Sequence, residues 1–121
     1  MDETTHAIVA TDRSGKIRQW SAGAARLFGW MEAEALGRSL DLIVPPDFRD
    51  AHWKGFHAAM ESAKSQLDGQ ATNIPVLCKD GQVRPFPARV TFLRDAYGRA
   101  AGNVIVYAEP KGGEVPFGPL L

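Results

Sequence analysis

The residues best suited to chemistry lie in one stretch, DFRDAHWKGFHAAMES (residues 47–62), which holds two of the three histidines. Residues three and four positions apart share a helix face, so His52 falls on the same stripe as Phe48 and Phe56. The whole stripe comprises Phe48, His52, Phe56, Ala59, Met60 and Ala63. An imidazole on this otherwise apolar face is either a packed core residue with a hydrogen bond or a ligand to something held in the core.

The other reactive side chains give weaker signals. His57 follows Trp53 by four positions, on the flank of the stripe, and is the second candidate for a ligand, whereas His6 is expected to be structural or solvated. The single cysteine, Cys78, cannot form an internal disulfide, and no Cys/His cluster is spaced for a metal. Without a catalytic pairing of Ser, His and Asp, or a glycine-rich phosphate loop, we expect no enzyme.

The elements around the stripe predict how it is positioned. Pro46 suits the first turn of the central helix, which is expected to end near Ser65. Two shorter helical pieces are expected at residues 22–28 and 32–36. Alternating apolar residues and turn signals predict strands at residues 6–11, 16–20, 73–79, 82–93 and 100–108. Strands grouped on both sides of helices indicate an α+β fold with an antiparallel sheet covered on one face, where a ligand can lie between the layers.

The bulk properties exclude several classes of partner. A chain of 121 residues, 45% of them hydrophobic, is large enough for one domain with one core. Lys and Arg number 14, as do Asp and Glu, which argues against nucleic acid or an anionic membrane as a partner. No run approaches the roughly 18 apolar residues of a membrane span, and the acidic start is unlike a signal peptide. We therefore expect a cytoplasmic protein.

Three segments resemble one known family. They are IVATDRSGKIRQWSAGAARLFGW, EALGRSLDLIVPPDFR and CKDGQVRPFPARVTFLRDAYGRAAGNVIVYA. Together, in this order, they resemble a PAS domain of the S-box type over residues 6–108. The resemblance implies a five-stranded antiparallel sheet in the order 2-1-5-4-3, with helices on one face, and a sensory or protein-interaction role. We expect the PAS domain to span residues 1–108 and residues 109–121 to form an irregular C-terminal tail.

The resemblance also indicates which of the cofactors found in this family to expect. Flavin-binding members carry a GRNCRFLQ-like segment with a reactive cysteine. Here the segment reads GRSLDLIV, with Ser39 and Leu40 where Asn and Cys would stand, and Cys78 lies on a later strand. Flavin photochemistry is therefore not expected.

Heme-binding PAS oxygen sensors are the better comparison. They hold iron through a histidine on the long helix, and PPDFRDAH places His52 at that position as the axial ligand. The expected apolar walls are Phe48, Phe56, Met60, Phe86, Val90 and Phe92. The propionates would need Arg49, Lys54 or Arg84. Thr72 stands where these sensors carry an arginine that responds to bound gas, so gas gating of that type is not implied.

Two classes of function follow. The first is a sensory PAS module that binds a small ligand or cofactor in its core, with heme held by His52 as the leading version. The second is a cofactor-free protein-interaction or dimerisation domain, in which His52 is a packed core residue. The expected partners are a small-molecule ligand or heme, a second copy in a homodimer, and a separate signalling protein.

Overall fold

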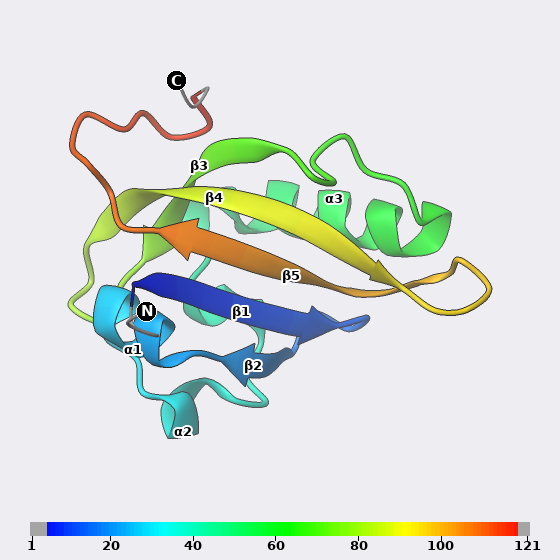
Figure 1. Ribbon diagram of the computed structural model, residues 1–121, viewed down its shortest axis with the longest axis horizontal. Helices are drawn as coiled ribbons and strands as arrows, with labels where there is room; N and C mark the ends of the chain where they lie inside the picture. The colour runs from blue at the N-terminus through cyan, green and yellow to red at the C-terminus, as the bar shows by residue number, and fades with distance from the viewer. Residues whose placement is uncertain (1–4, 119–121) are drawn as a thin grey trace.

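The computed structural model describes residues 5–118. Its strands are β1 (His6–Asp12), β2 (Ile17–Trp20), β3 (Ala71–Leu77), β4 (Val83–Arg94) and β5 (Ala100–Ala108). Its helices are α1 (Ala22–Phe28), α2 (Glu32–Ala35) and α3 (Arg49–Ser62), with single 3-10 turns at Leu40–Leu42 and Pro46–Phe48. All five expected strands and the central helix are present (Figure 1).

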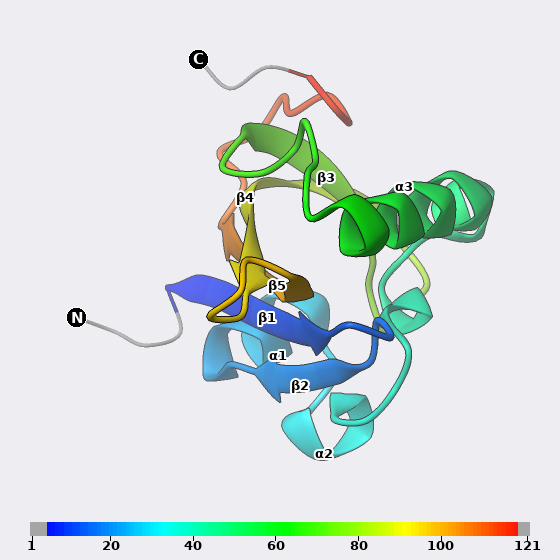
Figure 2. The ribbon, with the colours of Figure 1, turned by 90° about the vertical axis from the view of Figure 1, so that its right-hand side faces the viewer.

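The strands form one sheet in the order β2-β1-β5-β4-β3, with every neighbouring pair antiparallel. This confirms the predicted α+β class and the predicted strand order. Figure 2 shows α3 beside the β3 to β5 part of the sheet, and α1 and α2 beside β1 and β2. The helices thus leave the other face of the sheet uncovered.

Local sequence explains the boundaries of the first helix. Ser21 caps α1 by accepting a hydrogen bond from the backbone N–H of Ala24 at 3.1 Å. Gly29 ends the helix in the left-handed region, at φ 92°, which glycine adopts without steric cost. The helix therefore has the bounds expected from the sequence, residues 22–28.

The end of α3 differs from the expectation. The helix stops at Ser62 rather than near Ser65, because Ala63 takes a left-handed conformation at φ 57°. The guanidinium of Arg94 donates to the Ala63 carbonyl at 2.9 Å, so a residue of β4 satisfies the carbonyl at the helix end. This contact joins residues 31 positions apart, and no local pattern predicts it.

The prolines of β4 lie where the sheet can accept them. Pro85 and Pro87 pair with Pro75 and Asn73 of β3, whereas the pairing with β5 begins at Ala88. Proline has no N–H to donate, so it suits the part of the strand that pairs on one side. The start of β4 is therefore a section of an inner strand that pairs on one side only.

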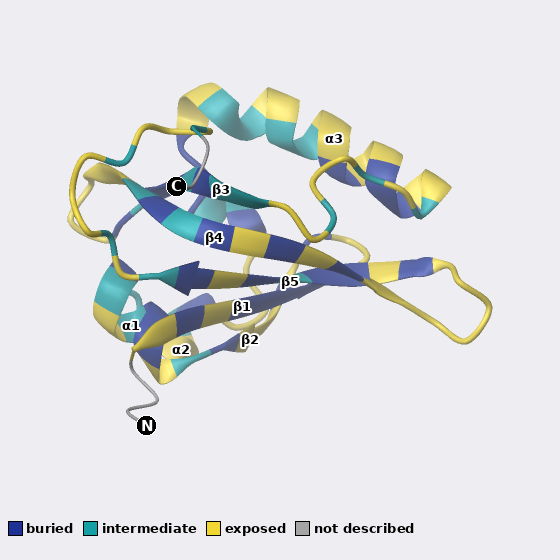
Figure 3. Ribbon diagram, turned by 45° about the horizontal axis from the view of Figure 1, so that its top comes forward, coloured by how far each residue is buried: buried dark blue, intermediate teal, exposed yellow. Residues whose placement is uncertain are grey.

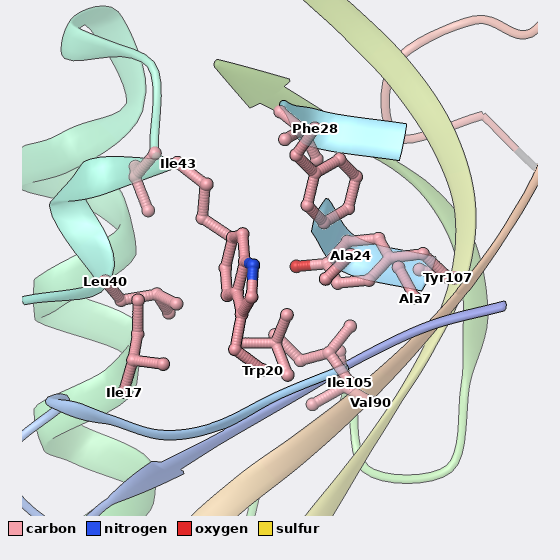
Figure 4. Close-up of a cluster of buried hydrophobic side chains, with 14 of the residues drawn as sticks. Ala7, Ile17, Trp20, Ala24, Phe28, Leu40, Ile43, Val90, Ile105 and Tyr107 are labelled. Carbon is pink, nitrogen blue, oxygen red and sulfur yellow. The ribbon is translucent and has the colours of Figure 1, made fainter. Parts of the chain in front are cut away.

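The main core lies between α1 and the sheet. Figure 4 shows Trp20, Phe28 and Tyr107 turned toward one another. Phe28 meets Tyr107 and Phe86 edge to face, with ring centroids 4.9 Å apart in both pairs. Along α3, β4 and β5, buried and exposed positions alternate in Figure 3, as amphipathic elements require. Within residues 5–118, no helix is both long and apolar enough to cross a membrane.

Candidate pocket between α3 and the sheet

A cavity of about 330 Å³ lies between α3 and the inner face of the sheet. From the helix side it is lined by Phe48, His52 and Phe56. From the sheet it is lined by residues that include Val90, Phe92, Asn103, Ile105 and Tyr107. Its walls are thus largely apolar, with few polar groups, as is usual for a small-molecule site.

The expected binding residues divide into two groups. His52, Phe48, Phe56, Val90 and Phe92 line the cavity. Met60 and Phe86 are buried but do not line it. Met60 lies at the far end of α3, and Phe86 packs against Phe28 and Tyr107 in the main core. The alternation of β4 places Phe86 on the inner face, but its position along the strand puts it outside the cavity.

His52 is half-buried at the cavity wall. Its ring meets Trp53 edge to face at 4.7 Å and stacks on Phe56 at 6.0 Å. Its Nδ1 is enclosed and has no hydrogen-bond partner among residues 5–118. Burial lowers the pKa of His52 below its ordinary value of 6.5, and the nearby charge of Asp41 opposes this shift. The imidazole is therefore neutral at pH 7 and has a lone pair available.

Trp53 fixes the orientation of the helix that carries His52. Its indole N–H donates to Asp41 Oδ1 at 2.7 Å. Its six-membered ring packs so closely on Gly15 that a Cβ there would lie 2.3 Å from two ring atoms. The half-buried Trp53 side chain thus contacts both the β1–β2 turn and the Asp41 carboxylate, and these two contacts orient α3.

Asn103 is a pocket residue that was not among those expected from the sequence. It is 5% exposed, lines the cavity from β5, and accepts a hydrogen bond from the Thr11 hydroxyl at 2.7 Å through Oδ1. Its amide nitrogen makes no hydrogen bond to the described residues. Asn103, Ile105 and Tyr107 are spaced by two residues, so their side chains lie on the same face of β5. A polar residue in this otherwise apolar series is the feature of the sequence that could have identified Asn103.

Two hydroxyl groups of the cavity wall already make a hydrogen bond. The Ser65 hydroxyl accepts from the backbone N–H of Leu67 at 3.1 Å, and the Thr72 hydroxyl donates to the Gly118 carbonyl at 3.4 Å. The Tyr107 hydroxyl makes no hydrogen bond to the described residues. His52 on the helix layer, and Asn103 and Tyr107 on the sheet, therefore keep unused hydrogen-bonding capacity.

The cations expected for propionates lie elsewhere. Arg49 donates to the carbonyl of Val44 at 3.1 Å, and Arg84 forms an ion pair with Asp80 at 2.7 Å. Neither of them lines the cavity, and nor does exposed Lys54.

The other histidines also lie away from the cavity. His57 is exposed and stacks on Trp53 at 5.7 Å, and His6 is exposed on β1. Residues 5–118 contain no group of three or more side chains that could hold a metal ion by themselves.

Comparison with solved structures agrees with this architecture. The PAS domain of a protein from Colwellia psychrerythraea superposes with a TM-score of 0.72 at 21% identity, covering 88% of this chain and 86% of that one. The PAS domain of the Cronobacter turicensis RpfR quorum-sensing receptor, solved in complex with C12:0, gives a TM-score of 0.65 at 17% identity, covering 87% and 93%. At these identities the likeness concerns the fold.

Two curated relatives are sensor proteins by name. The oxygen sensor protein DosP of Escherichia coli is 22% identical over 81 residues, 67% of this chain and 10% of DosP. The sensor protein FixL of Bradyrhizobium diazoefficiens is 39% identical over 46 residues, 38% of this chain and 9% of FixL. The chain thus spans about a tenth of the length of each. The family model described as the PAS fold matches residues 1–106, so the chain belongs to the PAS family of sensory and signalling modules.

Proposed function

We propose that this PAS domain senses a small ligand that enters the cavity between α3 and the sheet. The observation that carries the proposal is an apolar cavity of about 330 Å³ whose opposite layers hold polar groups with unused hydrogen-bonding capacity, among them His52 and Asn103. Apolar walls supply affinity, and a few polar groups fix the orientation of a ligand. A buried polar group without a partner costs stability, so a ligand that satisfies it gains free energy.

Heme is the specific ligand to test first. A neutral imidazole on the wall of an apolar cavity is the donor that heme iron needs, and His52 has this character. Phe48, Phe56, Val90 and Phe92 would contact the porphyrin faces and exclude water. Bound heme would supply an iron centre able to take a diatomic gas. Because Arg49, Lys54 and Arg84 do not line the cavity, the propionates would have to reach solvent.

Absorption spectroscopy tests the heme version. The protein is purified from cells supplied with a heme precursor, and its spectrum is compared with those of His52→Ala and His57→Ala. We expect a stoichiometric Soret band that His52→Ala shifts or abolishes and that His57→Ala leaves in place. Loss of the band in His57→Ala alone would make His57 the ligand, and no band after addition of hemin would rule out the heme version.

If the purified protein is colourless, a ligand other than heme must be sought. Native mass spectrometry of the purified chain then detects a retained small molecule, and Asn103→Leu should reduce its occupancy. A fatty acid of the kind named for the RpfR receptor would suit the apolar walls.

A cofactor-free interaction domain is the second candidate, and the open face of the sheet favours it. Ile8 of β1 and Val106 of β5 are register neighbours, and each is 39% exposed. Adjacent exposed aliphatic side chains on a sheet suit a protein partner, including a second copy of the chain. If this face forms a homodimer, Val106→Asp will convert the dimer to a monomer in size-exclusion chromatography with light scattering.

A further inference from the structure

The C-terminal tail returns across the fold after β5. Figure 1 shows it rising from the end of β5 and running back over β3. Gly112 and Gly113 both have positive φ, at 107° and 82°, where the chain reverses. The Glu114 carboxylate closes this turn by accepting from the backbone N–H groups of Lys111 and Gly112, both at 2.9 Å. The turn directs the next residues onto the free edge of the sheet.

The tail is joined to the edge strand β3 by a small set of hydrogen bonds. The Phe117 N–H donates to the Asn73 carbonyl at 2.6 Å, and the Asn73 side-chain amide donates to the Val115 carbonyl at 3.2 Å. The Thr72 hydroxyl reaches the Gly118 carbonyl at 3.4 Å. These bonds leave Asn73 only 4% exposed although it lies on the edge strand.

Phe117 lies on the boundary between the cavity and solvent. Its ring meets Phe48 edge to face with centroids 5.5 Å apart, and both rings line the cavity. Phe117 is nevertheless 56% exposed. Its φ of 58° is in the left-handed region, which a bulky residue occupies only when its surroundings hold it there. The ring is therefore held at the cavity mouth by the tail's contacts with β3 and by Phe48.

The attachment of the tail is also incomplete. Asn73 Oδ1 is buried without a hydrogen-bond partner among the described residues, and Val115 leaves 64% of its surface exposed. Segments with few buried contacts open at low free-energy cost, well before the whole domain unfolds. The tail can therefore release from β3 while the sheet and α3 remain in place.

We infer that residues 114–118 form a strap that completes the ligand cavity, with Phe117 as its gate. A small molecule enters or leaves when the strap releases, and a molecule in the cavity adds contacts to Phe117 that hold the strap closed. Because coupling between two sites is reciprocal, occupancy of the cavity and closure of the strap favour each other. This gives the domain an output at its C-terminal end. The inference rests on the proposed binding cavity but on no particular ligand.

Thiol labelling tests the gate without any ligand. Val90 lines the cavity and is 5% exposed, so Val90→Cys places a thiol inside it with little change in volume. Cys78, which is buried outside the cavity, reports unfolding of the domain. The labelling rates of both thiols with methyl methanethiosulfonate are followed by mass spectrometry of peptides. In the Val90→Cys background, Phe117→Ala is compared with the matched control Val115→Ala, which keeps the backbone carbonyl that Asn73 uses.

We expect Phe117→Ala to raise the labelling rate of the introduced cavity thiol roughly tenfold, since a ring contact and the apolar area behind it hold the closed state. Val115→Ala should leave that rate within about twofold, because surface substitutions change little. An unchanged rate in Phe117→Ala would overturn the inference. An equal rise at Cys78 would also overturn it, because it would show global destabilisation. The heme experiment fails or succeeds independently, since this test needs no bound molecule.

Discussion

The Thr11 hydroxyl donates a 2.7 Å hydrogen bond to Asn103 Oδ1 inside the protein, where the two residues are register neighbours on β1 and β5. Thr11 is 3% exposed and Asn103 is 5% exposed. The bond satisfies the amide oxygen and leaves the amide nitrogen as the group that Asn103 can offer to the cavity. The pairing of β1 with β5 thus determines which group of Asn103 a ligand meets.

This pair should be energetically coupled. Thr11→Val and Asn103→Leu should each lower the free energy of unfolding by about 1–3 kcal/mol, because each leaves a buried polar partner unsatisfied. The double variant removes both groups, so its loss should be smaller than the sum of the single losses. Urea denaturation of the four proteins measures the cycle, and strict additivity would show that the bond contributes nothing.

Acidification should weaken the fold through His52. Burial holds the pKa of the folded imidazole below 6.5, whereas the unfolded chain takes up the proton near that value. Between these two pKa values the unfolded chain binds more protons, so the free energy of unfolding falls as the pH decreases below about 6.5. Above that pH the contribution is fully present.

Denaturation at pH 7.5 and pH 5.5 tests this dependence. His52→Phe keeps an aromatic ring at the cavity wall but cannot titrate, so its loss of stability on acidification should be smaller than that of the unmodified protein. The matched control is His6→Gln, at an exposed site on β1, which should retain the full loss. An equal loss in His52→Phe would mean that other groups cause the pH dependence.

Gly15 should be intolerant of any side chain because of Trp53. Gly15 and Gly37 have nearly equal φ values, 83° and 80°, but only Gly15 has a neighbour where a Cβ would lie. Gly37→Ala should cost about 1–2 kcal/mol for the left-handed backbone alone. Gly15→Ala should cost about 1–3 kcal/mol more for the collision with the indole. Thermal and urea unfolding measure the stability of both variants. The additional loss caused by Gly15→Ala should disappear in a Trp53→Leu background.

Arg13 should hold the C-terminal end of α3 onto the sheet. One guanidinium nitrogen donates to the carbonyls of Met60 and Ala100, at 2.9 and 2.7 Å. Arg13→Met should lower the free energy of unfolding by about 1–2 kcal/mol, since both carbonyls lose a charged donor. Arg18→Met, which removes an exposed ion pair with Asp12, is the control and should cost below about 1 kcal/mol. If urea denaturation gives equal losses of unfolding free energy for the two variants, Arg13 does not hold α3 onto the sheet.

Much of the fold could be predicted because its signals are local. Ser21 and Gly29 mark the ends of α1, and the alternation of β4 correctly places Phe86, Ala88, Val90 and Phe92 in the interior. The position of His52 on an apolar stripe also places it toward the sheet, where the structure has it lining the cavity. Binding of heme by His52 stays a prediction.

The strands, the central helix and the inward face of that helix can be predicted from the sequence, because hydrogen bonding and periodicity act over a few residues. The packing of the layers brings Asn103 and Phe117 to the cavity and leaves Met60 and Phe86 outside it. Thr11 and Asn103 are 92 positions apart, and Phe117 meets Phe48 across the length of α3 and three strands. Contacts of this kind depend on how the layers pack, so they cannot be predicted from the types and spacing of side chains along the sequence.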